Sequence, residues 1–381
     1  MLTTLAIEGY RSIRSLRVGL GPVTVVTGPN GSGKSNLYRG LRVLAATGRD
    51  GAISALAREG GLDSTLWAGP EVIGRAVREG LAPAQGTVRS GPIALRLGFA
   101  SDGFGYAMDL GLPIPSQSMF ARDPEIKVEA VWHGPVLRSS GLLAERKGGQ
   151  VRLREASGWQ PADRRLRPWE SMLDEIDSPD LRGVRTMLQG WRFYDHIRTD
   201  AQSPVRAPDI GTRTPVLSAD GHDLAAALQT IRELGDADQL AKAIDRAFPG
   251  SRLEIGDLGG RMQLQLRQPN LLRPLGAEEL SDGTLRYLVW VAALLSARPA
   301  ELIVLNEPET SLHPDLLGPL AELIMAASAQ SQILVVTHAG PIVEQLERDG
   351  AALVELDKPH GETIVVDQGL LTEPAWAWPK R

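Results

Sequence analysis

The sequence predicts an α/β protein with a mostly parallel sheet, together with an antiparallel β-rich and helical insertion. Two patterns indicate the parallel sheet. An apolar run at 23–27 leads through a glycine-rich turn into a helical stretch at 35–46, and helix and strand patterns alternate after about residue 277. A third pattern indicates the antiparallel part, because glycine and proline turns separate short strand-like runs between about 92 and 155.

Composition narrows the function classes before any motif is considered. The 381 residues are 43% apolar and 23% charged, and the net charge of -5 gives no overall positive field for nucleic acid or anionic lipid. The absence of cysteine excludes disulfides and thiolate zinc sites, and it fits a reducing compartment. The longest apolar run, 288–295, is far shorter than the roughly 20 residues that cross a bilayer. We therefore expect a cytoplasmic protein without a membrane partner.

The elements before residue 277 follow from local patterns. Strands are expected at 2–7, 15–18, 23–27, 93–99, 106–110, 126–132 and 151–155. Helices are expected at 35–46, 223–234 and 238–248, followed by a hairpin at 253–266 that turns at Gly259 and Gly260. Residues 156–220 are rich in Arg, Pro and Asp and are predicted to be irregular. No sustained heptad pattern predicts a coiled-coil arm.

The glycine-rich turn fits the pattern of a phosphate-binding loop. It lies between a strand and a helix, where backbone N–H groups and the helix N-terminus face phosphate oxygens. Lys34 would reach the β- and γ-phosphates, and the Ser35 hydroxyl would bind Mg²⁺. The alternative is a glycine-rich turn with a chance Lys-Ser pair. The expected nucleotide-binding residues are Gly28, Pro29, Asn30, Gly31, Ser32, Gly33, Lys34, Ser35 and Asn36.

A second group of polar residues follows an apolar strand at 301–305. Glu307 is placed to polarise an attacking water as general base, and Asn306 stands where a carboxylate that supports Mg²⁺ is usual. An amide oxygen can still accept a bond from metal-bound water, but it brings no negative charge. A buried strand with polar ends is the alternative. A later strand at 332–336 ends at Thr337 and His338.

The segment Ser281-Asp282-Gly283 opens a helical run at 285–297. Ser281 is a good N-cap, and a capped helix start is the simplest interpretation. The same arrangement offers a hydroxyl, free N–H groups and a positive dipole end to a terminal phosphate. We therefore count these three residues as further candidates for nucleotide binding.

Together these motifs resemble ABC-type P-loop ATPases, most closely the branch that contains RecF, the SMC proteins and the OLD ATPases. The resemblance rests on GPNGSGKSN, ELSDGT, LIVLNEPETSLHPD and VVTHA, and it covers roughly 1–50 and 275–356. It implies an ATPase head with an N-terminal lobe at 1–100, an inserted region at 101–270 and a C-terminal lobe at 271–381. The sequence shows neither the SMC coiled coil nor the TOPRIM nuclease domain that OLD-type proteins carry.

The resemblance also implies a mechanism with ATP and Mg²⁺ between two subunits. One subunit's P-loop, Glu307 and Asn306 would hold the nucleotide, and Ser281 of a second subunit would contact the γ-phosphate. His338 would sense that phosphate, with Ser311 and His313 near the subunit contact. Gln85 and Gln117 are weak candidates for the Q-loop glutamine.

The expected function is a dimerising ATP switch in DNA repair or phage defence, with DNA and a separate nuclease or effector protein as candidate partners. Eight basic against three acidic residues at 138–167, beside Trp159 and Trp169, suit a phosphate backbone, although a solvated Arg-rich face is the favoured interpretation. A regulatory ATPase that binds only a protein partner is the main alternative. A transporter energy subunit is disfavoured by the long insertion. The cluster 191–195 is predicted to be core or interface rather than a site.

Overall fold

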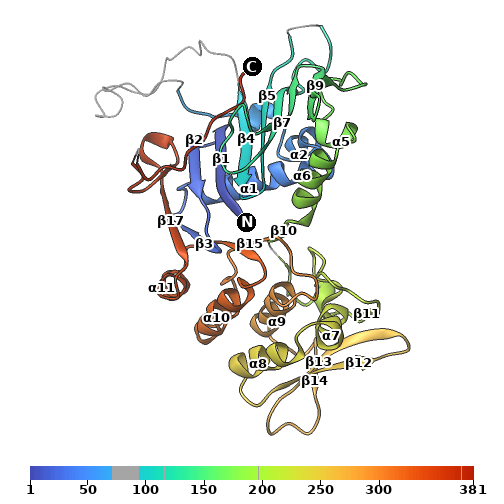
Figure 1. The fold of residues 1–381 in the computed structure, drawn as a ribbon. Coiled ribbons are helices and arrows are strands. Elements are labelled where there is room, and N and C mark those ends of the chain that lie inside the picture. The colour runs from blue at the N-terminus through green and yellow to red at the C-terminus, as the bar shows by residue number, and fades with distance from the viewer. Residues whose placement is uncertain (71–93, 115–116, 196, 370) are drawn as a thin grey trace. The chain divides into compact units, whose positions relative to one another are not determined.

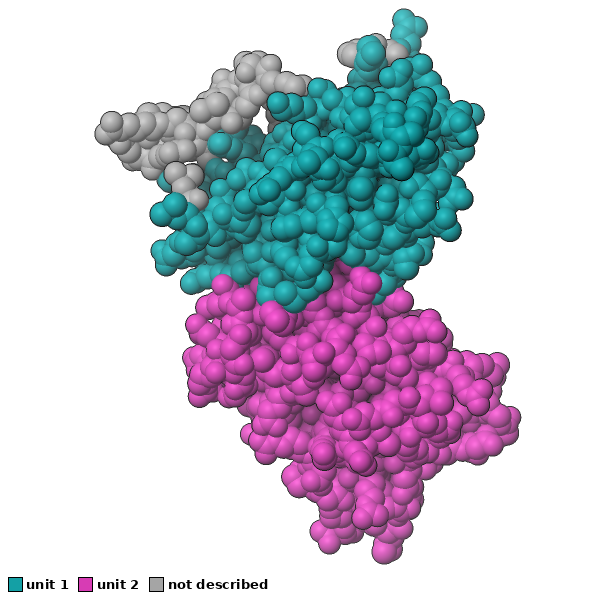
Figure 2. All heavy atoms as spheres, in the orientation of Figure 1, with its two compact units in different colours: residues 1–21, 26–190, 354–381 teal, residues 22–25, 191–353 magenta. Residues whose placement is uncertain are grey.

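The computed structural model describes residues 1–70, 94–114, 117–195, 197–369 and 371–381. The chain forms two compact units, and each is described by itself (Figures 1 and 2). Unit 1 contains residues 1–21, 26–190 and 354–381, and unit 2 contains residues 22–25 and 191–353. The chain passes from one unit to the other within β3 (Val23–Thr27) and β17 (Ala352–Asp357).

Unit 1 is built on an antiparallel sheet with the strand order β2-β1-β4-β5-β6-β7-β8-β9. The strands are β1 (Leu2–Tyr10), β2 (Ile13–Gly19), β4 (Leu95–Ser101), β5 (Phe104–Gly111), β6 (Glu125–His133), β7 (Leu142–Lys147), β8 (Gln150–Glu155) and β9 (Gly158–Pro161). Near the C-terminus, β17 pairs antiparallel with β18 (Ile364–Val365), preceded by a 3-10 turn, η3 (Pro359–Gly361).

Helices of unit 1 pack against the central strands of this sheet or against one another. They are α1 (Lys34–Ala46), α2 (Ala52–Arg58), α3 (Leu62–Thr65), α5 (Met172–Glu175) and α6 (Pro179–Gly190). α1 contacts β1 and β4, and α6 contacts β5 and β6 (Figure 1). A Cβ at Gly40 would lie 2.8 Å from Cδ1 of Ile7. Glycine therefore lets α1 approach the sheet closely, which fixes the helix that follows the phosphate-binding loop.

Unit 2 contains parallel strands in the order β10-β15-β16, with the beginning of β3 beside β16. β15 (Leu302–Asn306) and β16 (Gln332–Val336) are almost entirely apolar and buried, as parallel strands covered on both faces are. β10 (Arg192–Tyr194) pairs with β15 on the other side. Their carboxyl ends meet at one edge, where open α/β sheets bind ligands.

Five helices and a smaller antiparallel sheet complete unit 2. The helices are α7 (Leu224–Leu234), α8 (Ala237–Ala247), α9 (Asp282–Leu294), α10 (Leu317–Ala327) and α11 (Gly340–Arg348), with 3-10 turns η1 (Pro204–Arg206) and η2 (Pro314–Leu316), all within the described residues. The small sheet contains β11 (Asp209–Ile210), β12 (Arg252–Asp257), β13 (Arg261–Arg267) and β14 (Leu275–Gly276). α9 lies at the centre of the core, with its residues from Tyr287 to Leu294 all buried.

The α/β class with its parallel and antiparallel parts is confirmed, but two local predictions were wrong. Residues 156–220 are not irregular, because they contain α6 and β10, and β7 and β9 were not expected. Leu181, Val184 and Leu188 form the buried stripe of α6 at helical spacing, which the surrounding arginines obscured. α9 begins at Asp282, three residues before the predicted helix start.

The lobes predicted at 1–100, 101–270 and 271–381 remain a prediction. The residues of the expected insertion contribute to both units: β5 to β9 extend the sheet of β1 and β2, whereas β10 joins the parallel strands of unit 2. Across the described ranges, none of the helices combines the length and the apolar character that crossing a membrane requires.

Candidate functional site

The predicted phosphate-binding loop lies in unit 1, between β3 and α1. Gly28, Gly31 and Gly33 all have positive φ angles, of 143°, 83° and 109°. Side chains are rarely tolerated in this region of conformational space, so the tight wrap of the loop depends on glycine. The buried Lys34 ammonium donates hydrogen bonds to the carbonyl oxygens of Gly28 at 2.5 Å and Pro29 at 3.1 Å. Its positive charge therefore lies within the loop.

Polar residues from distant parts of the chain form hydrogen bonds that support the loop. Thr363 donates from Oγ1 to the Ser32 carbonyl oxygen at 2.9 Å, and its hydroxyl lies 2.7 Å from Ser12 Oγ. Asn36 donates from Nδ2 to the same Ser12 hydroxyl at 2.7 Å. A Cβ at Gly33 would lie only 2.1 Å from Thr363 Oγ1, so this glycine is required by contact as well as by its φ angle.

The loop's hydroxyl groups suit an oxyanion and a cation. Ser32 Oγ is buried and has no hydrogen-bond partner among the described residues. Such an orphaned donor is costly in a folded protein, and a phosphate oxygen would satisfy it. Ser35 is exposed at the start of α1, where its hydroxyl is accessible to a hydrated cation. The residues present therefore fit a nucleotide phosphate with Mg²⁺.

A second cluster of candidate residues lies in unit 2, where β15 and β16 end. The backbone N–H of Glu307 donates to the Val336 carbonyl at 2.7 Å, which ties the two strand ends together. Glu307 has a φ of 49°, an uncommon conformation for a residue other than glycine. Its carboxylate Oε1 lies 3.8 Å from Nδ1 of His338. The predicted general base, Glu307, and the histidine predicted to sense the γ-phosphate, His338, are thus brought together.

Glu309 links the same two strand ends from below the surface. Its Oε1 accepts a hydrogen bond from the Thr337 hydroxyl at 2.5 Å and from the His338 backbone N–H at 3.3 Å. The same oxygen lies 3.6 Å from His338 Nδ1. The side chain is only 9% exposed, and Oε2 is buried with no hydrogen bond within the described part of the chain. Glu309 therefore positions His338, a role that the sequence analysis missed.

Asn306, the third member of this edge, has a carboxylate beside it. Its Nδ2 donates to Oδ1 of Asp195 at 3.0 Å. Asp195 follows β10 directly, and β10 runs parallel to β15. Residues 191–195 were predicted to be core or interface rather than a site. That prediction holds for the buried Trp191 and Tyr194.

The further candidates for nucleotide binding, the signature segment Ser281-Asp282-Gly283, lie at the start of α9. Ser281 is the N-cap, as the simplest interpretation expected, and its Oγ accepts a hydrogen bond from the Thr284 N–H at 3.1 Å. Ser281 and Asp282 are exposed. A Cβ at Gly283 would lie 2.9 Å from the carbonyl oxygen of Ser311, which itself has a φ of 64°. Glycine thus lets the start of α9 approach the loop that follows β15.

Arg206 holds the segment before α9 in place, and this residue too was missed. Its Nη1 donates to the carbonyl oxygens of Ala277 at 2.7 Å and Leu280 at 2.8 Å. Its Nη2 pairs with Oδ1 of Asp282 at 2.6 Å. One guanidinium therefore fixes the backbone before Ser281 and neutralises the carboxylate after it.

Comparison with known proteins identifies the family. A family model described as "AAA domain, putative AbiEii toxin, Type IV TA system" matches residues 23–341. The chain belongs to this family. No curated protein matches its sequence.

This AAA-domain protein is also similar in fold to two solved SMC heads. One is the SMC head bound to the C-terminal winged-helix domain of ScpA, with a TM-score of 0.52, 14% identity, and coverage of 97% of this chain and 98% of that chain. The other, from Pyrococcus furiosus, is an SMC head with an extended coiled coil bound to the C-terminal domain of ScpA, with a TM-score of 0.50, 13% identity, and coverage of 97% and 96%. The family match supports the expected resemblance to P-loop ATPases, and the expected ATPase-head fold is confirmed by its likeness to these SMC heads.

Other predicted residues lie outside these two clusters. Gln85 lies outside the described residues, and Gln117 is exposed in the loop after β5, in unit 1. His313 is 71% exposed and caps η2, with Nδ1 3.3 Å from Oδ2 of Asp315. The roles of Ser311 and His313 at a subunit contact stay predictions.

The basic segment 138–167 is partly neutralised within unit 1, where four of its eight basic residues form ion pairs. Arg146 is completely buried and pairs with Glu129 at 2.9 Å, and Arg152 pairs with Glu145 at 2.5 Å. Arg152 and Arg154 both stack on the ring of Trp159. DNA contact by this segment therefore stays a prediction, with fewer unpaired charges than the sequence suggested.

Proposed function

We propose that this AAA-domain protein binds ATP with Mg²⁺, hydrolyses it, and uses the nucleotide to join two copies of the chain. The observation that carries the proposal is the edge of the parallel strands in unit 2, where Asn306, Glu307 and His338 lie together. Polar side chains at such an edge suit phosphoryl transfer to water. The loop at 28–36 adds support, because its buried Ser32 hydroxyl has no hydrogen-bond partner among the described residues and could bind a phosphate oxygen.

Each residue has a distinct role in this proposal. Lys34 and the backbone of residues 28–36 would neutralise and orient the β- and γ-phosphates, while Ser35 and Asn306 would hold Mg²⁺. The cation neutralises charge on the phosphates when it is bound. Glu307 would accept the proton of the attacking water, and His338, positioned by Glu309, would contact the γ-phosphate.

The proposed dimer rests on the exposed start of α9. Ser281 presents a hydroxyl and the helix N-terminus presents a positive dipole, while Arg206 neutralises Asp282 so that this carboxylate repels a phosphate less. The residues Ser281, Asp282 and Gly283 of a second copy would thus complete the nucleotide site. We assign the dimer a DNA-linked role, either repair or phage defence.

The test is nucleotide binding and hydrolysis by the full chain. Wild-type protein should bind ATP and release phosphate, whereas Glu307→Gln should bind ATP and release phosphate at least about 100-fold more slowly. Equilibrium dialysis with labelled ATP and a phosphate-release assay measure the two steps. Hydrolysis by Glu307→Gln at the wild-type rate would remove Glu307 from the proposed role.

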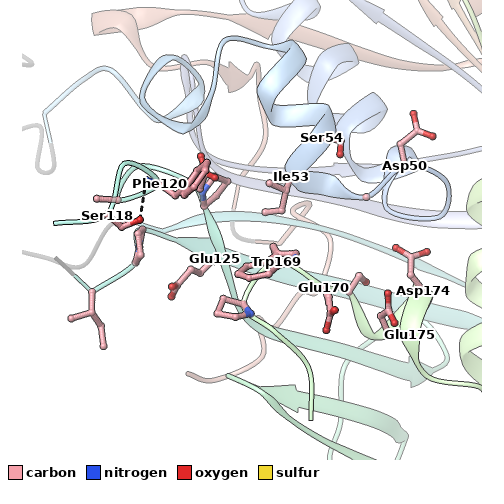
Figure 3. A pocket seen from close by; sticks show the side chains of 18 residues that line it. Asp50, Ile53, Ser54, Ser118, Phe120, Glu125, Trp169, Glu170, Asp174 and Glu175 are labelled. Carbon is pink, nitrogen blue, oxygen red and sulfur yellow. Dashed lines mark hydrogen bonds between the residues drawn. The ribbon is translucent and has the colours of Figure 1, made fainter. Parts of the chain in front are cut away.

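A pocket in unit 1 favours a second candidate, a regulatory ATPase that acts on a protein partner. The pocket has a volume of about 890 Å³ and lies between α2, the loop before β6 and the segment that leads into α5. Figure 3 shows Trp169 facing Ile53 across it, with Glu125 and Glu170 to either side. Six of its described lining residues are acidic and none is basic. Trp169 and Phe120 are 56% and 72% exposed.

Five of the six carboxylates pair with cations outside the lining, so the exposed aromatic rings are the feature that suits a protein partner better than a phosphate backbone. Binding of a labelled DNA duplex, followed by anisotropy at salt concentrations from about 50 to 200 mM, separates the two candidates. Affinity that falls steeply with salt supports the DNA-linked role. Absence of binding at low salt favours the protein partner.

A further inference from the structure

β15, the strand that corresponds to the Walker B strand of P-loop ATPases, ends in an uncharged residue, and the structure shows what lies beside it. Mg²⁺ in nucleotide sites is usually held by one or two carboxylates together with the substrate's phosphates. Asn306 supplies an amide at the end of β15, where that carboxylate is expected. The negative charge must therefore come from another residue if Mg²⁺ is held as in related sites.

Asp195 is level with Asn306 at the edge of the same sheet. β10 pairs with β15 in parallel, with Tyr194 opposite Leu305. The next residues along the chain are Asp195, directly after β10, and Asn306, the last residue of β15. Because the carboxyl ends of parallel strands present their side chains at a single edge, both side chains belong to the ligand-binding edge.

The hydrogen bond between the two residues fixes the orientation of the amide. An ionised carboxylate can only accept hydrogen bonds, so the Nδ2 of Asn306 must face Asp195, as the 3.0 Å contact shows. The Oδ1 of Asn306 then points away from the carboxylate and can accept a bond from metal-bound water. The pair offers a full negative charge and an oriented amide oxygen side by side.

Buried neighbours hold Asp195 in position. Trp191, directly before the short strand β10, and Tyr194, its last residue, are almost completely buried, and the Tyr194 hydroxyl donates to the Leu217 carbonyl at 3.2 Å. A carboxylate on such a rigid support keeps its geometry without a ligand, which is what a metal site requires.

We propose that Asp195 supplies the carboxylate toward the Mg²⁺ of bound nucleotide that Asn306 cannot supply, so that the Walker B function is divided between two neighbouring strands. This inference rests on the proposed ATP binding. It predicts that the metal affinity depends on the presence of one carboxylate in the pair, whether that carboxylate is at position 195 or at position 306.

The test uses the full chain with ATP and Mn²⁺, which replaces Mg²⁺ and is detected by electron paramagnetic resonance. Asp195→Asn should weaken Mn²⁺ binding in the ATP complex by about 10- to 100-fold, while ATP affinity in EDTA stays within about twofold of wild type. The double variant Asp195→Asn with Asn306→Asp returns one carboxylate to the pair and should regain Mn²⁺ affinity to within about threefold of wild type. Asp200→Asn, an exposed carboxylate paired with Arg198, is the matched control and should change nothing.

The outcomes separate the inference from the function on which it rests. Unchanged Mn²⁺ affinity in Asp195→Asn overturns the inference while leaving ATP binding intact. Failure of the wild-type protein to bind ATP with or without metal overturns the proposed function as well. Circular dichroism shows whether Asp195→Asn folds. If it does not fold, the double variant tests the inference instead, because it keeps a hydrogen bond between an amide and a carboxylate. Weak Mn²⁺ binding by the folded double variant would count against the inference.

Discussion

The two halves of the proposed site, the loop of unit 1 and the strand ends of unit 2, achieve their geometry in different ways. In unit 1 the loop at 28–36 presents backbone groups, and glycines with positive φ angles decide its shape. In unit 2 side chains at strand ends carry the chemistry, and two of them lie against a second side chain: Asn306 against Asp195 and His338 against Glu309. Nucleotide binding by the first half should therefore be lost when its backbone conformation or its Lys34 cation changes. Hydrolysis, which depends on the second half, should slow by smaller steps as its supporting pairs of side chains are broken.

The largest expected effect belongs to the first half. Lys34→Ala removes the cation that lies within the loop, and charge-assisted hydrogen bonds to phosphate are worth about 1.5 to 3 kcal/mol each. ATP affinity should fall by at least about 100-fold, as measured by equilibrium dialysis. Lys242→Ala, an exposed lysine on α8, is the control. Wild-type affinity in Lys34→Ala would contradict the loop assignment.

A smaller loss is expected when a supporting pair in the second half is broken. Glu309→Gln should leave ATP affinity unchanged but slow hydrolysis by about 10- to 100-fold, because the hold on Thr337 and His338 is weakened and reacting groups tolerate little displacement. Phosphate release at saturating ATP measures this. Glu347→Gln, an exposed residue of α11, should behave as wild type. Equal rates in both variants would show that Glu309 has no positioning role.

Arg206 provides an intermediate test, because it supports both backbone and side chain of the signature segment. Arg206→Ala should weaken nucleotide-dependent dimerisation by about tenfold, and Arg206→Lys should recover only part of that, since lysine lacks the planar fork that reaches two carbonyls at once. Sedimentation with Mg-ATP over a range of protein concentrations gives the dimer affinity. Arg198→Ala serves as control, and full recovery by lysine would mean that only the charge matters.

The sequence was sufficient for the elements whose signal is local. The apolar runs of β3, β15 and β16, and the polar residues that end them, predicted the parallel strands and their common edge. The supporting residues could not be found in this way. Thr363 reaches Ser32 from the other end of the chain, Asp195 meets Asn306 only because β10 pairs with β15, and Arg206 reaches Asp282 through folding alone.

Asp195 also shows why composition can mislead. It follows Trp191, Arg192, Phe193 and Tyr194, a cluster whose large side chains predicted core. The cluster does supply core residues, yet the next residue along the chain is at the ligand edge because β10 ends there. A strand of three residues gives too little periodicity to reveal this from the sequence.

The smallest expected effect concerns the stability of unit 1. Burial raises the pKa of Asp174 from 3.8 to about 6. The folded state therefore binds more protons than the unfolded state between about pH 4 and 6, and this group's contribution to stability falls as pH rises through that window. Asp174→Asn should raise the free energy of unfolding at pH 8 by about 1 kcal/mol or less, after allowance for its partial exposure, with no gain at pH 4.

Urea unfolding of the wild type and Asp174→Asn at the two pH values measures this difference. Asp123→Asn, an exposed carboxylate in the same pocket, should leave the pH dependence unchanged. A gain at pH 4 equal to that at pH 8 would show that the effect of Asp174 does not come from its charge.

The central claim, that ATP joins two copies of the chain, is tested most directly by the molar mass of Glu307→Gln with and without Mg-ATP. Because this variant should bind ATP without cutting it, the γ-phosphate stays between the loop of one copy and Ser281 of the other. Light scattering should show a dimer with Mg-ATP and a smaller mass without it. Adding Ser281→Arg should abolish the dimer while bound nucleotide is retained. The same mass with and without ATP, in a variant shown to bind ATP, would contradict the account.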